Sequence, residues 1–147
     1  MTTKGDLAAE KFASGFNCAQ SVIWAFADEL GLDKNLILKL ATGFGGGMGH
    51  EQEVCGAVSG GVFALGAKFG RDETGTRDQT NATYQKVQEL FARFRERHGT
   101  CICGELLPDC NLATPAGQQK FKDSGLRDKV CKECVRDAAN FTAELLR

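Results

Sequence analysis

The sequence contains few residues that interrupt helices, since its 147 residues include only two prolines. Because proline breaks helices, this composition favours helical structure. Neither sign of charge dominates: the formal net charge is −1, which argues against the broad basic surface that nucleic-acid-binding proteins present. The uncharged stretch over residues 54–67 is rich in glycine and too short for a bilayer, which takes about 20 apolar residues. We therefore expect no nucleic-acid partner and no membrane insertion.

The N-terminal segment also lacks the apolar core of a secretory signal, because Met-Thr-Thr-Lys-Gly-Asp leads directly into a charged amphipathic stretch. We expect a soluble, cytoplasmic protein. In that reducing compartment, clustered cysteines are more typical of metal binding or redox catalysis than of structural disulfides. The length fits one domain, residues 1–147, with a core of its own.

Apolar residues recur at helical spacing, and no segment sustains the alternation of a β-strand. The pattern predicts a single compact all-α domain of about five to seven helices. The expected helices cover residues 7–16, 17–31, 33–41, 53–69, 77–98, a short turn at 104–107, a turn after Pro115 and a last helix from about 128 to 145. The helix over 53–69 carries small residues at Gly56, Ser59, Gly60 and Ala64. Such residues permit close helix–helix approach, so we expect this helix at the centre of the domain.

Cysteine is the residue type in excess, with seven in the chain, an odd number that disulfides cannot fully pair. Four of them are distributed along the sequence, and each is expected to open a helix: Cys18, Cys55, Cys103 and Cys131. A helix N-terminus stabilises negative charge, so these positions predict lowered thiol pKa values. If the four converge, their thiolates repel one another, and a bound cation or cluster would remove that conflict.

The remaining three cysteines, Cys101, Cys110 and Cys134, lie close in sequence to the last two of the four. Cys131 and Cys134 make a C-x-x-C on a helix, typical of a redox dithiol or half of a metal site. Cys101 and Cys103 make a C-x-C, which is common in metal sites and awkward for an internal disulfide. Free cysteine is also often a small buried hydrophobe, and this interpretation stays open for Cys110 and Cys134.

A glycine-rich loop, residues 43–50, precedes Cys55. It contains no dinucleotide-binding or P-loop pattern. We expect its backbone to wrap closely around a site beside Cys55 and to offer N–H groups to anionic sulfur, although a plain flexible connector is the alternative. His50 adjoins this loop and His98 continues the apolar stripe of the helix over 77–98, and we assign neither as a ligand.

At Cys55-Gly56-Ala57-Val58-Ser59-Gly60 the chain resembles a redox-active protein family named for its C…CGAxxG…C…C cysteine pattern. The resemblance extends from about Asn17 to Ala139 and includes Asn17-Cys18-Ala19-Gln20 and Cys103-Gly104-Glu105-Leu106-Leu107. It implies a small, mostly helical redox domain with family cysteines at Cys18, Cys55, Cys103 and Cys131. A similar domain is associated with an iron–sulfur site. Cys101, Cys110 and Cys134 are additions, so Cys101 could replace Cys103 and Cys134 could replace Cys131, or the additions could form a second thiol pair.

Three functional hypotheses follow. The first is an electron-transfer protein in which Cys18, Cys55, Cys103 and Cys131 bind an iron–sulfur cluster or another thiolate-liganded metal. The second is an oxidoreductase without metal that cycles between dithiol and disulfide. The third is a zinc-stabilised interaction module. Each redox hypothesis implies an unidentified partner protein, and the composition also permits a homodimer.

Overall fold

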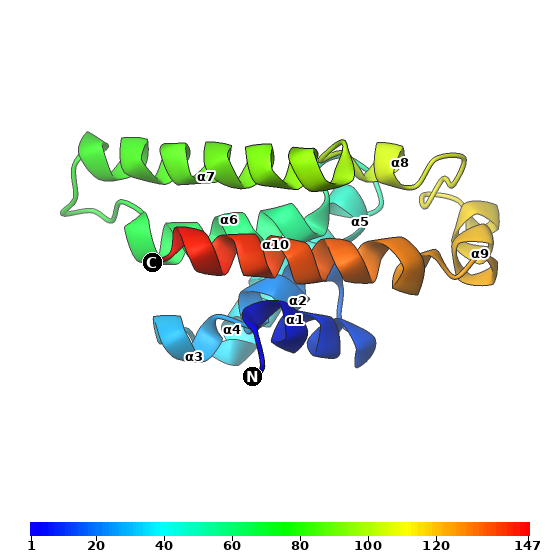
Figure 1. Ribbon diagram of the computed structural model, residues 1–147, viewed down its shortest axis with the longest axis horizontal. Helices are drawn as coiled ribbons and strands as arrows, with labels where there is room; N and C mark the ends of the chain where they lie inside the picture. Colours follow the sequence, from blue (N-terminus) through cyan, green and yellow to red (C-terminus); the bar gives the residue numbers. More distant parts are fainter.

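The computed structural model describes residues 1–147 and confirms an all-α domain (Figure 1). Its only β-type pairing is a single antiparallel bridge between Val54 and Ile102. The helical elements are α1 (Lys4–Ala13), α2 (Cys18–Trp24), α3 (Ala27–Leu30), α4 (Lys34–Ala41), η1 (Thr42–Phe44), α5 (Gly45–Met48), α6 (Gly56–Phe69), α7 (Arg77–His98), α8 (Cys103–Leu106), α9 (Pro115–Asp123), η2 (Arg127–Cys131) and α10 (Lys132–Leu145).

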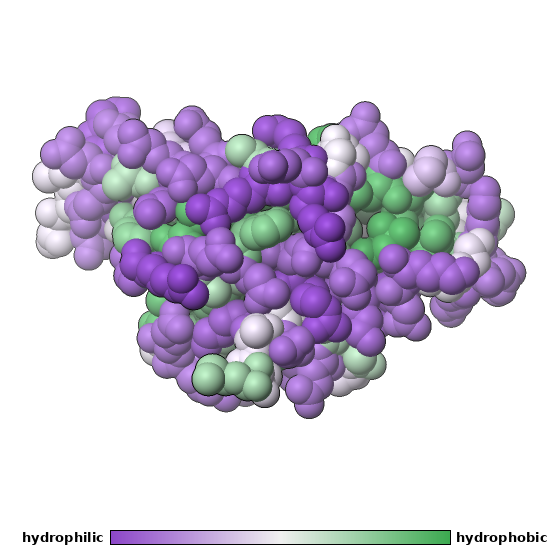
Figure 2. All heavy atoms as spheres, in the orientation of Figure 1, coloured by the Kyte–Doolittle hydropathy of each residue, from purple (hydrophilic) through white to green (hydrophobic).

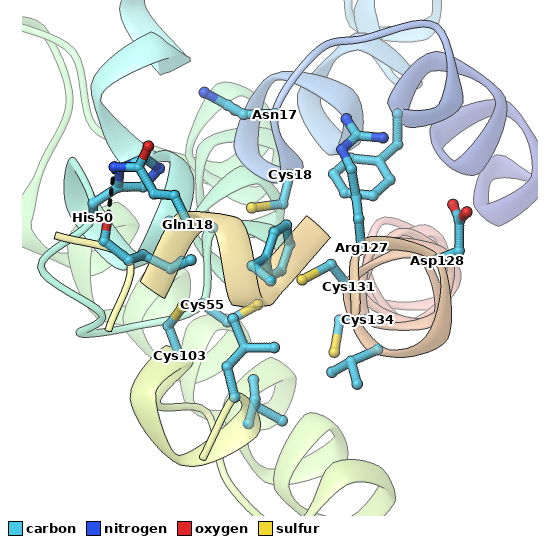
Figure 3. Close-up of a pocket in the computed structure, with 18 of the residues that line it drawn as sticks. Asn17, Cys18, His50, Cys55, Cys103, Gln118, Arg127, Asp128, Cys131 and Cys134 are labelled. Carbon is cyan, nitrogen blue, oxygen red and sulfur yellow. Dashed lines mark hydrogen bonds between the residues drawn. The ribbon is translucent and has the colours of Figure 1, made fainter. Parts of the chain in front are cut away.

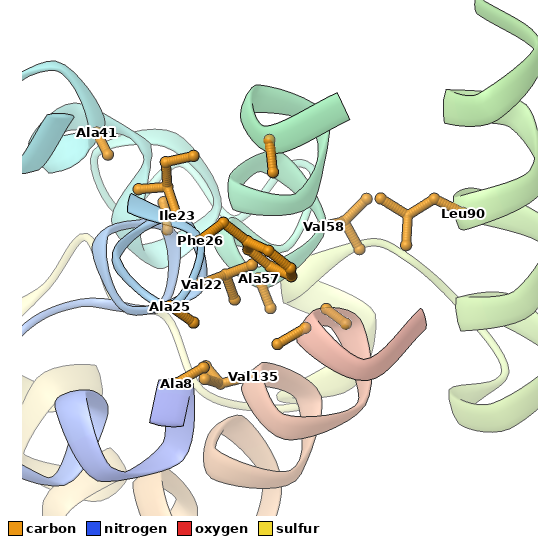
Figure 4. Close-up of a cluster of buried hydrophobic side chains, with 14 of the residues drawn as sticks. Ala8, Val22, Ile23, Ala25, Phe26, Ala41, Ala57, Val58, Leu90 and Val135 are labelled. Atoms are coloured by element: carbon orange, nitrogen blue, oxygen red, sulfur yellow. The ribbon is translucent and has the colours of Figure 1, made fainter. Parts of the chain in front are cut away.

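Helix α6 is the centre of the domain, as predicted, because α2, α7 and α10 all pack against it. Figure 4 shows Ala57 and Val58 of this helix facing side chains from α2, α7 and α10. The small residues make that approach possible. A Cβ on Gly60 would lie 2.7 Å from the Ala19 carbonyl oxygen, and one on Gly61 would lie 2.5 Å from Thr142 Oγ1.

Helices α7 and α10 run side by side along the molecule, and α1 and α2 lie on the other side of α10 (Figure 1). At the N-terminal end of α1 the Gly5 N–H donates to Asn140 Oδ1 at 2.7 Å, and Arg136 pairs with Asp6. These contacts tie the first helix to the last, so the two ends of the sequence stabilise the same part of the fold.

Several helix limits follow from capping residues that the sequence shows. Asn17 forms a capping box with Gln20 at the start of α2, and Asp33 caps α4. Gly31 and Gly99 end α3 and α7 in the left-handed conformation that favours glycine. The limits of α7 agree with the prediction.

Other limits differ from the prediction, for local reasons. The first helix begins at Lys4, where Thr3 caps it. The segment predicted as one helix over 17–31 divides at Ala25 and Phe26 into α2 and α3. Helix α6 begins at Gly56 and not at residue 53, because Val54 is extended in the bridge with Ile102. The last helix opens with a π-helical turn, η2, that ends at Cys131.

None of the helices is both long and apolar enough to span a membrane. Figure 2 shows a mostly hydrophilic surface, with apolar atoms gathered toward the end of the molecule where α8 and α9 lie. A second, smaller core lies at this end, formed by Cys103, Leu107, Cys110 and Leu112. This end of the molecule also holds the cysteine cavity.

Candidate redox site

Five of the seven cysteines line one open cavity of about 520 Å³ (Figure 3). They come from α2, the N-cap of α6, α8, η2 and α10, and so from segments far apart in the sequence. The five are Cys18, Cys55, Cys103, Cys131 and Cys134. All four cysteines that the sequence distributes over helix starts therefore reach the same cavity, and Cys134 joins them.

A short backbone clamp fixes Cys55 relative to Cys103. The Cys55 N–H donates to the Cys101 carbonyl at 2.8 Å, and the Cys103 N–H donates to the Glu53 carbonyl at 2.7 Å. These bonds flank the bridge between Val54 and Ile102. Two cysteines on distant segments thus sit on one small rigid unit.

Cys18 is held at the first position of α2 by the Asn17 cap. The side-chain amide of Asn17 also donates to the Thr42 carbonyl at 2.9 Å, which ties this helix start to the glycine-rich loop. The backbone N–H of Gly46 in that loop donates toward the Cys18 sulfur. A left-handed backbone at Gly46 and Gly47 (φ 66° and 69°) allows this close approach. The loop therefore supplies an N–H group to cavity sulfur, as expected from the sequence.

The protonation behaviour of the thiols differs from the prediction. Burial, together with the charge on Cys55, raises the pKa of Cys18 to about 11, and burial raises the pKa of Cys103 to about 12. The pKa of Cys131 is raised as well, again chiefly by burial. The predicted lowering is wrong for these three, because lost hydration and repulsion between thiolates outweigh the helix N-termini.

Among the cysteines, Cys55 alone has a lowered pKa. The main cause is the Cys134 thiol, which donates toward the Cys55 sulfur, and the N–H groups of Ala57 and Val58 add to it. The pKa of Cys134 is raised in return, because a thiol that donates to a neighbouring thiolate resists losing its own proton. The cavity therefore contains one sulfur prepared to carry negative charge and one thiol oriented to stabilise it.

The cavity wall away from the sulfurs is largely apolar and includes Phe12, Phe16 and Phe121. Arg127 lies over the Phe12 ring at 3.7 Å and donates to the Phe16 carbonyl at 2.8 Å. Such a wall limits water around the sulfurs, which strengthens every electrostatic interaction between them.

Cys101 and Cys110 do not line the cavity. The Cys101 thiol donates to the Phe91 carbonyl at 3.6 Å inside the main core. The Cys110 thiol donates to the Gly117 carbonyl at 3.2 Å in the smaller core. Both behave as small buried residues, which favours Cys103 over Cys101 at the cavity and separates the additional cysteines from one another.

His98 contacts Cys134 but does not line the cavity. His98 Nδ1 lies 3.9 Å from the Cys134 sulfur, and His98 Nε2 lies 2.9 Å from Asp137 Oδ2. The sequence did not lead us to single out His98 from an ordinary core histidine. One signal was available: His98 ends α7, and Cys134 and Asp137 are three residues apart and share a helix face. His50 lines the cavity next to the glycine-rich loop.

Comparison with known proteins identifies the family to which the sequence is similar. A family model described as "Putative redox-active protein (C_GCAxxG_C_C)" matches residues 16–145. The chain belongs to this family. It is also 27% identical over 139 residues to an uncharacterised protein of Archaeoglobus fulgidus, an alignment that covers 89% of this chain and 85% of the relative. No solved structure shows a significant match.

The family match spans every cysteine of the cavity. The family's description writes the second cysteine segment as GCAxxG, with a glycine before the cysteine. In this member of the family the segment reads Cys55-Gly56-Ala57-Val58-Ser59-Gly60, so its first glycine follows the cysteine. A Cβ on Gly56 would lie 2.7 Å from the Cys18 sulfur, and one on Gly60 would lie 2.7 Å from the Ala19 carbonyl oxygen. Both glycines of the segment therefore allow α6 to approach α2 at the cavity.

Proposed function

We propose that this member of the redox-active family is an electron-transfer protein whose cavity holds an iron–sulfur cluster through Cys18, Cys55, Cys103 and Cys131. The observation that supports the proposal is the convergence of these four cysteines, from four separate segments, on one cavity. Cysteine thiolates are the usual ligands of such clusters.

The donor set fits a cluster better than a single ion. No three His, Cys, Asp or Glu side chains lie close enough together to hold one metal ion. A tetrahedral zinc site needs its ligands around one centre. In a cluster, different thiolates bind different irons, which suits sulfurs distributed around a cavity wall. The zinc-stabilised module therefore receives no support from this arrangement.

The protein's own groups would bind and tune such a cluster. The clamp between residues 52–55 and 101–104 orients Cys55 and Cys103. The N–H of Gly46 faces Cys18, and N–H groups at the start of α6 face Cys55. Hydrogen bonds to ligand sulfurs raise a cluster's reduction potential, and the apolar part of the wall reduces the cluster's contact with water. When bound, the cluster supplies one-electron transfer to a partner protein.

Anaerobic purification and reconstitution with iron and sulfide test the proposal, with the visible spectrum and iron and acid-labile sulfide contents as readouts. Serine variants of Cys18, Cys55, Cys103 and Cys131 should each lose most of the bound iron. Cys101→Ser and Cys110→Ser are the matched controls, because both cysteines are buried but lie off the cavity. Full iron and sulfide in all four cavity variants, or a wild-type protein that forms no cluster, would contradict the proposal.

A second function, thiol–disulfide exchange without metal, is favoured by the pairing of Cys55 with Cys134. The Cys55 thiolate would attack a substrate disulfide, form a mixed disulfide and release one substrate thiol. Cys134 would then attack the Cys55 sulfur and release the second thiol, leaving a disulfide between Cys55 and Cys134. The substrate is thereby reduced by two electrons and the protein oxidised by two.

Peptide mapping after mild oxidation separates the two functions. The exchange mechanism requires a reversible disulfide between Cys55 and Cys134 in a colourless, iron-free protein that stays active. A protein that transfers electrons only after reconstitution with iron and sulfide would rule this second function out.

A further inference from the structure

A chain of side chains leads from the cysteine cavity to the rim of the α7–α10 interface. Cys134 lines the cavity together with Cys55; from its sulfur the chain runs 3.9 Å to His98 Nδ1, and from His98 Nε2 2.9 Å to Asp137 Oδ2. Cys134 is 1% exposed, whereas the side chains of His98 and Asp137 are 15% and 17% exposed. This series of side chains therefore joins a buried sulfur to groups that reach solvent.

The surroundings of His98 fix the orientation of its ring. The Phe94 ring packs against it with centroids 4.5 Å apart. From α10, Cys134 and Asp137 face its two nitrogens, and from its own helix Arg97 shares Asp137 at 3.3 Å. No other ion pair or hydrogen bond involves the His98 ring. Each ring nitrogen therefore has one partner.

The hydrogen-bonding rules allow this chain two arrangements. An ionised Asp137 only accepts, so Nε2 carries a proton in both. When His98 is neutral, Nδ1 has no proton and accepts from the Cys134 thiol. When His98 is charged, Nδ1–H donates to the Cys134 sulfur, and the thiol proton is free to point at Cys55. Cys134 carries one proton in each arrangement, so only His98 gains or loses one.

We propose that His98 and Asp137, acting through Cys134, form a relay that couples uptake of one proton to reduction of the cavity centre. The inference rests on the proposed function, because it requires a centre that is reduced at the cavity. Reduction adds negative charge to the sulfurs. That charge favours the arrangement in which His98 is protonated and Cys134 donates to Cys55.

The coupled step balances in charge and atoms. One electron arrives from an external one-electron donor, such as a flavin or iron–sulfur protein in the cell or an electrode in the experiment. One proton is taken up from solvent and ends on His98 Nδ1, while Nε2 keeps its proton and its hydrogen bond to Asp137. Reoxidation returns the electron to an acceptor and the proton to solvent. His98 and Asp137 are positioning residues, since neither contacts the reacting centre.

Voltammetry of the reconstituted protein at a series of pH values tests the relay. The wild-type midpoint potential should fall as pH rises across the range in which histidines titrate, about pH 5 to 8. His98→Gln keeps a polar side chain but cannot take up the proton, so its potential should be flat over that range. Cys134→Ala breaks the connection and should also be flat. Cys101→Ala, another buried cysteine, should keep the wild-type slope.

Nitrogen NMR of the reduced, metal-free protein gives a second readout that needs no cluster. The chain has two histidines, and a His50→Gln variant assigns their signals. Neutral His98 should carry its proton on Nε2, and Asp137→Asn should weaken that preference.

Three outcomes would overturn the inference. The first is a proton on Nδ1 of neutral His98, and the second is the same pH slope in wild type and His98→Gln. The third is the absence of any redox signal from every variant. That third outcome is distinct because it contradicts the proposed function itself, and the inference then falls with it.

Discussion

Cys55 and Cys134 show how two like side chains acquire opposite properties from their positions. Cys55 is at the N-cap of α6, where N–H groups of the first turn face its sulfur. Cys134 lies in the first turn of α10, which continues the helical turn η2, and its thiol lies between Cys55 and His98 as possible partners. The pKa of Cys55 is lowered and that of Cys134 is raised. Proximity, and not residue type, decides which sulfur becomes charged.

This difference predicts the order of alkylation in the reduced, metal-free protein. Cys55 should react with iodoacetamide at a lower pH than the other cavity cysteines, because the thiolate is the reactive form. A hydrogen bond to a charged group contributes about 1.5–3 kcal/mol, so Cys134→Ala should slow Cys55 alkylation at pH 7 by roughly tenfold or more. Mass spectrometry of labelled peptides measures both rates. An unchanged rate in Cys134→Ala, with Cys101→Ala as the control, would refute the pairing.

Sequence reasoning located the site better at some residues than at others. Cys18, Cys55, Cys103 and Cys131 were singled out because their spacing and expected helix positions are visible in the sequence. The low pKa expected for all four was wrong for three, since burial and mutual repulsion depend on tertiary packing. His98 was missed because its role depends on two α10 residues that the sequence separates from it by more than thirty positions.

At the scale of the elements, helix α6 contains several glycines, which are weak helix formers, and one of them lies in a crowded position. Gly56 lies where a Cβ would be 2.7 Å from the Cys18 sulfur and 2.9 Å from the Phe44 carbonyl oxygen. Gly66, in the same helix, has open space around it. The same residue type therefore serves close packing at one end of the helix and only lowers helix propensity toward the other.

These two glycines give a matched pair of variants. Gly56→Ala should destabilise the protein by about 1–3 kcal/mol, because overpacking forces α2 and α6 apart at the cavity. Gly66→Ala should stabilise it by about 0.5–1 kcal/mol, since alanine is the better helix former. Urea unfolding measures both changes. A neutral Gly56→Ala would show that the contact with Cys18 is readily relaxed.

Helix limits were predictable where a local signal sets them. Asn17, Asp33 and Gly99 mark their helix ends through side-chain capping or left-handed backbone, which need only neighbouring residues. The start of α6 was misplaced because Val54 pairs with Ile102, a partner that no local pattern reveals. Elements were thus predictable to the extent that their causes are local.

At the scale of the whole molecule, the buried thiols predict how stability depends on pH. The folded-state pKa values of Cys18 and Cys103, about 11 and about 12, lie above the ordinary thiol value. The folded protein keeps these protons where the unfolded chain loses them. Stability is therefore fully present below the ordinary thiol pKa and falls as pH rises toward 11. The lowered pKa of Cys55 acts in the opposite direction but involves only one thiol.

Urea unfolding of the reduced, metal-free protein between pH 7.5 and 10.5 tests this prediction. Each buried thiol with a raised pKa should reduce the free energy of unfolding by up to about 1.4 kcal/mol per pH unit above its ordinary pKa. Cys18→Ala should give a shallower decline than wild type, because one titrating group is removed. Equal slopes in the two proteins would show that Cys18 titrates normally in the folded state.

The clamp that joins Cys55 to Cys103 has a consequence for how the protein matures. During synthesis, this half of the site can form as soon as residues 101–104 pair with 52–55. Cys131 is placed only when α10 packs against α1 and α6, and α10 follows both clamp segments in the sequence. A partly made chain therefore presents an incomplete socket. Loading of a cofactor that uses all four cysteines must therefore follow the docking of α10.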